Sequence, residues 1–287
     1  MRSRAEWIAA AFKWSCLAEL DAPKPGNVHV FAGGHRMTAD EFVASADAAA
    51  PALSAEGARV GARILGAVEA TLACIGANTN LGIILLCAPL AAAADAESSD
   101  LRASLVEVLR DLDTEDARLA FRAIVRAAPA GLGHSARHDV FEPATVSLLQ
   151  AMAEAADRDR IARQYATSFA DVFDLGLPLF EAASRRHADP KWGTLTTYLG
   201  FLSAFPDSHI LRKYDAQIAD EVRRTAATFL SSLQAAKHPA QLLPELLAWD
   251  AALKADSLNP GTSADLTVAT LFVHRLRTIL PSMRNSG

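Results

Sequence analysis

Apolar residues recur at every third or fourth position along most of the chain, which is the spacing of one face of an α-helix. One such stripe consists of Ile64, Val68, Leu72 and Ile75. We find no segment that alternates apolar and polar residues as a half-buried strand does. The pattern therefore predicts an all-α protein, with about ten to twelve helices at ordinary helix and loop lengths.

Several helix starts are marked by side chains that can cap a first turn. Thr38 and Glu41 have the spacing of a capping box. Asp113 precedes a negatively charged turn, which suits the positive end of a helix dipole. Pro143 suits the first turn of a helix that contains residues 146–156. These signals predict three helix beginnings.

The most apolar segment covers residues 81–94 and includes Pro89. Because a membrane span needs roughly twenty apolar residues, we interpret this segment as a buried core helix. Turn-forming residues separate the helical segments, but we find no long Gly/Ser linker and no internal repeat. We therefore expect one all-α domain that comprises residues 1–287.

Composition narrows the class of protein. Hydrophobic residues make up 51% of the chain and charged residues 21%, with a formal net charge of −5. This excludes intrinsic disorder and argues against partners such as nucleic acid or an anionic membrane surface. The three cysteines give no disulfide framework, and we recognise no signal peptide at the start. We expect a cytoplasmic protein; a homo-oligomer is left open.

The first loop with candidate chemistry is Pro23-Lys24-Pro25-Gly26, followed by Asn27. Two prolines keep the backbone around Lys24 extended, so its ammonium group would be presented at a fixed place. A cation that is ordered in advance loses less entropy when it binds a phosphate. The alternative interpretation is a helix-to-helix turn with a solvated lysine.

The second loop places Asn78, Thr79 and Asn80 between two strongly apolar segments. Polar groups in buried surroundings need partners, so these residues are candidates for ligand binding. Glu69 falls within the apolar segment before the loop, where an ionised carboxylate is costly unless it is paired or faces a cleft. Alternatively, Glu69 points outward, and Thr79 or Asn80 caps the next helix.

Three later loops carry the remaining candidates. Asp139 follows a glycine-containing segment whose two histidines, His134 and His138, lack the pattern of a zinc protease. A fourth loop, which leads into a helix, contains Asp207, His209, Arg212 and Lys213. A fifth combines a Pro-Gly turn with Ser263 and Asp265. Helix starts of this kind favour anions, which points to a phosphorylated ligand.

Together these loops resemble the triphosphoribosyl-dephospho-CoA synthase family. Its motifs are matched here by Pro23-Lys24-Pro25-Gly26, by Asn78-Thr79-Asn80-Leu81-Gly82 and by Pro260-Gly261-Thr262-Ser263-Ala264-Asp265-Leu266. Their order and approximate spacing also match, over about residues 19–276. Segments at 26–29, 138–140 and 207–210 look more like the archaeal and methylotroph branch of the family.

Two departures from the family pattern are visible. The family's Gly-Ala-His-x-Asp-Met element is reduced to Gly33-Gly34-His35-Arg36-Met37, which lacks the aspartate. Its His-Lys pair in the second loop is replaced by Asn80 and Leu81. The loss of this lysine removes one positive charge from the implied polyphosphate site.

The resemblance implies an all-α transferase that moves the triphosphoribosyl group of ATP onto the 2′-hydroxyl of 3′-dephospho-CoA and releases adenine. Such a glycosyl transfer calls for a carboxylate near the sugar and for groups that exchange protons. As hypotheses, Asp265 and Glu69 are the base and the charge stabiliser, in either order, and Asp207 binds Mg²⁺ together with Asp139. The substrate-binding candidates are Lys24, Asn27, Asn78, Thr79, Asn80, Gly82, His209, Arg212, Lys213 and Ser263.

Two alternatives remain open at this point. One is a related ATP-dependent transferase with a different acceptor, such as the precursor of a C1-carrier cofactor. The other is a helical nucleotide-binding protein without catalysis, in which the altered second loop and the absent aspartate mark lost activity.

Overall fold

The computed structural model describes residues 2–33, 38–96, 98–129, 133–135 and 137–284. Over these residues the chain forms fourteen α-helices and no strand, and an isolated bridge pairs His29 with Ala32. The all-α prediction is confirmed, although the helix count exceeds the expected range. The excess arises from very short helices, which span too few residues to show a helical period.

The helices are α1 (Arg4–Leu20), α2 (Ala39–Leu53), α3 (Val60–Ile75), α4 (Leu81–Asp95), α5 (Leu101–Arg110), α6 (Thr114–Ala127), α7 (Leu148–Ala155), α8 (Arg160–Ala166), α9 (Leu177–Arg186), α10 (Lys191–Ala204), α11 (Ser208–Leu211), α12 (Ala216–Ala235), α13 (Leu243–Ala255) and α14 (Gly261–Arg284). A π-helical segment, η1 (Asp171–Gly176), precedes α9, and a 3₁₀ segment, η2 (Pro239–Leu242), precedes α13.

Two of the three predicted helix starts are confirmed. Thr38 caps α2 in a capping box with Glu41, and Asp113 caps α6. The start at Pro143 is wrong, because α7 begins at Leu148 behind the cap residue Ser147. Ser147 and Gln150 form a complete capping box there, which satisfies backbone groups that a proline start leaves unpaired.

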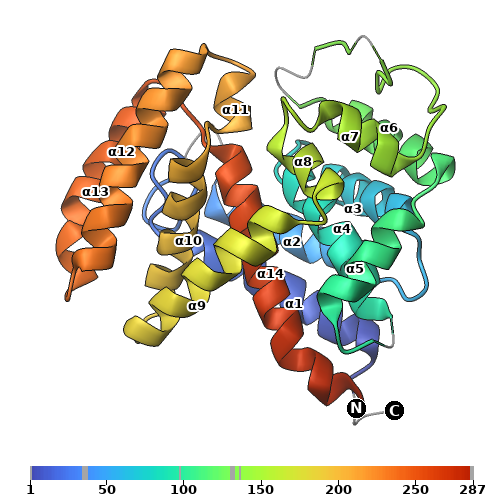
Figure 1. Ribbon diagram of the computed structural model, residues 1–287, viewed down its shortest axis with the longest axis horizontal. Coiled ribbons are helices and arrows are strands. Elements are labelled where there is room, and N and C mark those ends of the chain that lie inside the picture. Colours follow the sequence, from blue (N-terminus) through green and yellow to red (C-terminus); the bar gives the residue numbers. More distant parts are fainter. Residues whose placement is uncertain (1, 34–37, 97, 130–132, 136, 285–287) are drawn as a thin grey trace.

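The larger hydrophobic core is built around α4, the apolar segment of the sequence. Twelve of its residues are buried, and the helix packs against α1, α3, α5 and α14. Pro89 lies inside the helix and does not end it. In Figure 1, α3 to α8 form the right-hand group of helices, and α14 runs beside α1 through the middle of the molecule. The expectation of a buried core helix at residues 81–94 is confirmed.

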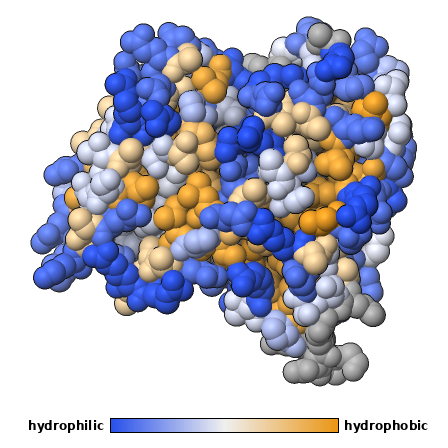
Figure 2. Space-filling view, viewed as in Figure 1, coloured by the Kyte–Doolittle hydropathy of each residue, from blue (hydrophilic) through white to orange (hydrophobic). Residues whose placement is uncertain are grey.

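A second hydrophobic cluster joins α10, α12 and α13 to the start of α14. These helices form the left-hand group in Figure 1. On the face shown in Figure 2, hydrophilic residues cover much of the outer margin of this group, and apolar residues gather toward the middle. Helix α14 contributes to both clusters, so it connects the two groups. No helix in the described part of the chain is long and apolar enough to span a membrane.

Candidate functional site

A cavity of about 740 Å³ collects most of the predicted site residues. It is lined from the start of α4, from α8, from α11 and from the start of α14. The predicted residues that line it are Asn27, Asn78, Thr79, Asn80, Gly82, Asp139, His209, Arg212, Lys213 and Asp265. Its volume is in the range of about 300–1,000 Å³ that is typical of small-molecule and cofactor sites.

The first and fifth loops are neighbours in space, although more than two hundred residues separate them in the sequence. Gly26 has a φ of 82°, and a Cβ atom there would lie 2.8 Å from Pro260 Cδ. The Asn27 Nδ2 donates a hydrogen bond of 2.8 Å to Asn259 Oδ1. The Tyr198 hydroxyl donates to the Pro25 carbonyl at 2.6 Å. Glycine is required at position 26 because both its φ and its contact exclude a side chain.

Asp265 lies in the first turns of α14 and faces the start of α4. A Cβ atom on Gly82 would be 2.0 Å from Asp265 Oδ2, so the carboxylate packs directly on the glycine backbone. Among the described residues, no hydrogen bond reaches this carboxylate. Burial raises the pKa of Asp265 well above its usual range, and the carboxylates of Asp207 and Glu19 raise it further. A carboxyl group with a raised pKa exchanges protons readily near neutral pH.

Asp207 holds two helix starts together instead of facing the cavity. Its Oδ1 accepts a hydrogen bond from His209 N at 2.8 Å, and its Oδ2 accepts two from Ser263, from N and Oγ, both at 2.8 Å. The side chain is fully buried. The expected Mg²⁺ role of Asp207 does not fit this position, because both oxygens are already engaged. Ser263 is also buried and bonds to Asp207, not to the cavity.

Asp139, the second candidate for Mg²⁺, lines the cavity but is also engaged. It accepts hydrogen bonds from Ser135 N at 2.8 Å and from Phe141 N at 3.0 Å, and it pairs with His134 at 3.1 Å. The two backbone bonds lower the pKa of Asp139. In the described ranges of the chain, no group of three or more His, Cys, Asp or Glu residues is arranged to hold a metal ion. A metal cage built by the protein alone therefore does not fit these residues.

Asp159 is a cavity residue that the sequence analysis missed. Its Oδ1 caps α8 through Ile161 N and Ala162 N, and its Oδ2 accepts a 2.7 Å hydrogen bond from Arg212 Nη1. The Arg212 Nε is buried and has no hydrogen-bond partner among the described residues. Lys213 next to it is exposed. The sequence offered one indication of Asp159, because aspartate is a favoured cap residue and this one directly precedes the short helix α8.

The polar loop before α4 contributes to the cavity wall and to its own turn. Asn80 is the cap residue of α4, as the alternative interpretation expected, and it makes no side-chain capping bond. The Asn78 Oδ1 accepts a 3.1 Å hydrogen bond from Leu81 N instead. The Thr79 and Ser45 hydroxyls lie 2.5 Å apart. All three loop residues line the cavity, so the position of Asn80 matches the capping interpretation and ligand binding by the loop stays a prediction.

Lys24 does not reach the cavity. Its side chain is 0% exposed, and its ammonium group donates to the Val28 carbonyl and lies 3.1 Å from Glu19 Oε1. The expectation of a phosphate-binding ammonium group at this loop is therefore corrected to a buried ion pair. Glu19, which the sequence analysis passed over, lines the cavity. Burial raises the pKa of Glu19, and Lys24 lowers it.

Glu69 lies elsewhere. It is on α3 with 38% of its side chain exposed, and its Oε1 accepts a 2.8 Å hydrogen bond from Arg126 Nη1. It does not line the cavity. Its position matches the alternative in which this carboxylate points outward and is paired, and gives no support to a catalytic role. In the altered glycine-rich element, positions 34–37 lie outside the described residues.

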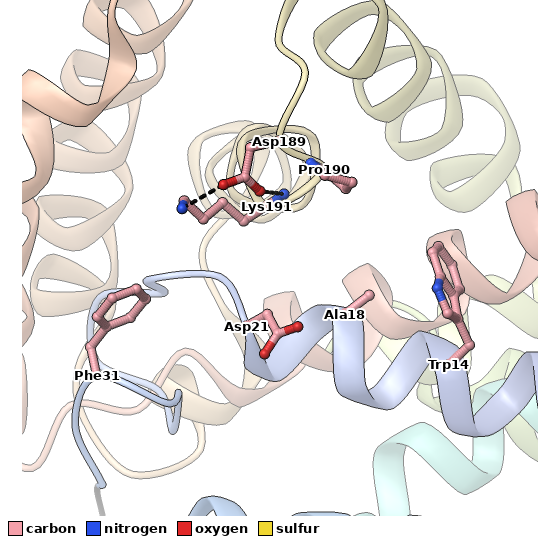
Figure 3. A pocket seen from close by; sticks show the side chains of 7 residues that line it. All are labelled: Trp14, Ala18, Asp21, Phe31, Asp189, Pro190 and Lys191. Atoms are coloured by element: carbon pink, nitrogen blue, oxygen red, sulfur yellow. Dashed lines mark hydrogen bonds and ion pairs between the residues drawn. The ribbon is translucent and has the colours of Figure 1, made fainter.

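A second, smaller hollow of about 360 Å³ lies on another part of the surface. Figure 3 shows Trp14, Ala18 and Asp21 along α1, below the Asp189–Lys191 ion pair at the start of α10. None of the predicted site residues lines this hollow. The larger cavity, with its uncommitted carboxylate and its cations, is therefore the candidate active site.

Comparisons with known proteins identify the family of the chain. A sequence model of the family described as ATP:dephospho-CoA triphosphoribosyl transferase matches residues 5–282. The chain is also similar to a crystal structure from Archaeoglobus fulgidus that is described, provisionally, as a triphosphoribosyl-dephospho-CoA synthase. The identity is 26%, over 81% of this chain and 97% of that chain, with a TM-score of 0.64. No curated protein matches. The family match includes every residue that lines the cavity.

Proposed function

This chain belongs to the ATP:dephospho-CoA triphosphoribosyl transferase family, and from that membership we propose that its 740 Å³ cavity is the place of the reaction. The triphosphoribosyl group of ATP is transferred there to the 2′-hydroxyl of dephospho-CoA, and adenine leaves. The observation that carries the proposal is Asp265, a carboxylate without a hydrogen bond from the described residues, which lies against Gly82 inside the cavity.

Asp265 takes the proton of the acceptor hydroxyl. The oxygen of that hydroxyl then forms the new bond to C1′ of the ribose, while the bond from C1′ to N9 of adenine breaks and its electron pair stays on adenine. The proton released by the acceptor balances the proton that adenine takes up. The raised pKa of Asp265 makes its ionised form a stronger base than an ordinary aspartate.

Arg212 and Lys213 bind the triphosphate. Arg212 faces the cavity with a buried Nε that no described residue satisfies, and a phosphate oxygen is a suitable acceptor for it. Asp159 orients the guanidinium group from the other side at 2.7 Å. Partial desolvation and the positive charge of Arg212 lower the pKa of the exposed Lys213. A bound anion beside this ammonium group would raise the pKa again.

Ribose and base contact the polar loop at the start of α4. Asn78, Thr79 and Asn80 line the cavity beside Gly82. Asn27 extends this wall from the first loop, where its hydrogen bond to Asn259 fixes the amide. Hydrogen bonds from such side chains orient a nucleoside and give specificity more than affinity.

A further set of cavity residues binds the acceptor in this proposal. Arg158 and Arg137 line the cavity, together with His134 and His138. Arg158 donates to Ser135 Oγ at 2.9 Å, and Arg137 pairs with Glu154 at 2.6 Å. Because both substrates carry phosphate groups, several cations at one cavity suit a reaction that joins them.

The substrate triphosphate, and not a protein cage, would hold Mg²⁺ in this proposal. The ion prefers oxygen ligands, keeps several waters and often uses substrate phosphates as ligands. It therefore needs no cage of protein carboxylates, in keeping with the engaged oxygens of Asp207 and Asp139. Its contribution when bound is to neutralise phosphate charge.

The test is an assay for free adenine. Purified protein is incubated with ATP and Mg²⁺, with and without dephospho-CoA, and adenine is quantified by chromatography. Release that depends on dephospho-CoA supports the proposal. Adenine release only with a different acceptor, such as a C1-carrier precursor, would contradict dephospho-CoA as the acceptor. ATP binding without adenine release, for every acceptor of a broad panel, would contradict the transferase reaction itself.

The proposal also covers the cellular location and the oligomeric state of the enzyme. We place it in the cytoplasm, where ATP is abundant, and allow for a homo-oligomer. Light scattering coupled to size-exclusion chromatography measures the particle mass, and a value of 30.5 kDa would identify a monomer. Fractionation of producing cells tests the location.

A further inference from the structure

Glu19 is a buried carboxylate in the wall of the candidate active site. It lies in the last turn of α1, is only 4% exposed and still lines the cavity. Its Oε1 lies 3.1 Å from the Lys24 ammonium group. Among the described residues, nothing donates a hydrogen bond to its other oxygen. A buried carboxylate with one oxygen left unpaired at a cavity wall is costly and calls for an explanation.

Lys24 fixes the position of this carboxylate. The lysine is enclosed completely, and its ammonium group contacts Glu19 and the Val28 carbonyl. The loop that carries it is anchored in turn, because Gly26 N donates a 2.8 Å hydrogen bond to Asp250 Oδ1. Lys24 therefore cannot bind a ligand in the cavity, but it can hold Glu19 in one place and offset its charge.

Glu19 and Asp265 face the same cavity from different helices. Glu19 belongs to α1 and Asp265 to α14, which lie side by side. The negative charge of Glu19 is one of the causes that raise the pKa of Asp265, so the two carboxylates interact electrostatically. The two carboxylates differ in their polar partners. Glu19 forms an ion pair with Lys24, whereas no described residue donates a hydrogen bond to the Asp265 carboxylate.

Resting on the transferase function proposed above, we propose that Glu19 is the second catalytic carboxylate, which contacts the ribose and stabilises positive charge at C1′, and that Lys24 is its positioning residue. Glu19 thus takes the place that the sequence analysis gave to Glu69. Asp265 keeps the proton transfer.

The role of Glu19 follows from the electron flow. As the bond between C1′ and N9 breaks, both of its electrons leave with adenine, and positive charge develops on C1′ and the ring oxygen. A fixed carboxylate beside that charge stabilises the transition state more than the ground state. Glu19 neither gains nor loses a proton in this step, and Lys24 keeps its proton affinity below that of an unpaired buried carboxylate.

The decisive variant removes both charges of the pair. Glu19→Gln alone leaves Lys24 buried without a counter-ion, which is strongly destabilising and threatens folding. The double variant Glu19→Gln, Lys24→Met keeps the shapes and removes both charges, and such replacements are often neutral for stability. Circular dichroism and the unfolding midpoint verify that it folds.

We expect the double variant to bind ATP, measured by calorimetry, within about threefold of wild type, while kcat for adenine release falls about 100- to 1,000-fold, the usual loss for a preorganised electrostatic group. A kcat within tenfold of wild type overturns the role of Glu19. Loss of ATP binding in parallel with kcat also overturns it, because Glu19 would then be a binding or structural group. If wild-type protein releases no adenine, the transferase function fails first, and this inference fails with it.

Lys24→Met supplies a second test that does not depend on the double variant. Besides Lys24, the titratable groups that interact with Glu19 are Asp265, Cys16 and Tyr198. Loss of the cation raises the pKa of Glu19, so the acidic limb of kcat/KM moves up by about one pH unit or more. A purely structural Lys24 would lower activity at every pH and leave the limb in place, which would overturn its positioning role.

Discussion

The floor and the rim of the cavity hold their charged groups in different ways. We call Glu19, Gly82 and Asp265 the floor, and His134, Arg137, Arg158 and Lys213 the rim. The floor residues lie on helices of the hydrophobic core. Asp265 packs directly on Gly82, and Glu19 is held by its buried ion pair with Lys24. The rim residues are exposed and are held by surface ion pairs or by none. Because surface pairs contribute about 0–1 kcal/mol, the rim can adjust to a ligand while the floor cannot. This difference supports the proposal that the chemistry takes place at the floor and that the rim binds the substrates.

Asp265→Asn tests the floor most strongly. We expect kcat for adenine release to fall about 10²–10⁴-fold, since general acid–base groups contribute on this scale. Because the activity needs the ionised form of Asp265, the wild-type rate should rise with pH through the raised pKa of this group. The variant should lose the part of that limb that Asp265 sets and keep the part that Glu19 sets. Wild-type turnover in a folded variant would remove Asp265 from the mechanism.

Gly82→Ala tests the contact that supports the floor. The new Cβ would overlap Asp265 Oδ2 at 2.0 Å, so the carboxylate must move away. A displacement of about 1 Å can cost roughly 100-fold in rate, and we expect a loss of this order in kcat. Ala77→Ser, in the same loop but outside the cavity lining, is the matched control and should keep full activity. If Gly82→Ala were as active as Ala77→Ser, the contact between Gly82 and Asp265 would not support catalysis.

Lys213→Ala tests the rim. Removal of one exposed phosphate contact should raise the KM for ATP about tenfold, equivalent to about 1.4 kcal/mol of binding, with little change in kcat. The exposed cation is not part of the packed floor, so folding should be unaffected. A large fall in kcat with an unchanged KM would move Lys213 from binding to chemistry.

The stability of Asp265→Asn gives an independent view of the floor. A carboxyl group whose pKa is raised by folding binds protons more tightly in the folded state, so the stability of the wild type falls as pH rises above about 4, the pKa of an unfolded aspartate. The variant has no such cost. Chemical denaturation should show it more stable than wild type at neutral pH, with the gap closing near pH 4. If Asp265→Asn were less stable than wild type at neutral pH, the buried Asp265 carboxylate would not be a cost to the stability of the fold.

Glu69→Gln should have the smallest effect. Glu69 is exposed and forms surface ion pairs with Arg126 and Arg122. We expect kcat/KM within about twofold of wild type and a stability change below about 1 kcal/mol. Steady-state kinetics and thermal denaturation measure both. A large loss of activity would restore Glu69 as a catalytic candidate.

Much of the fold could be predicted because its signals are local. The caps at Thr38 and Asp113 and the apolar segment at 81–94 each depend on residues within a few turns of each other. The helix starting near Pro143 was misplaced because a favourable residue at one start competed with a complete capping box at Ser147. Short helices such as α11, with four residues, have no period to detect.

The site was predicted only in part because its geometry depends on distant contacts. Asn78, Arg212 and Asp265 were identified from the kinds of residue in their loops, and they do line one cavity. Asp207 was misjudged because a carboxylate before a helix serves equally well as a cap or as a ligand. Glu69 was selected and Glu19 was passed over, because both lie in helices and the exposure of a helix residue depends on what packs against it.

The sequence by itself determined the helices, the family and the kinds of polar group in each loop, because propensity, capping and motif spacing are properties of neighbouring residues. Only the tertiary structure decided which carboxylates face the cavity. Glu19 acquires its place from Lys24 in the next loop, and Asp265 acquires its place from Gly82, which lies far away in the chain. Burial and charge pairing arise only when separate helices pack, and they set the protonation behaviour on which the proposed chemistry depends.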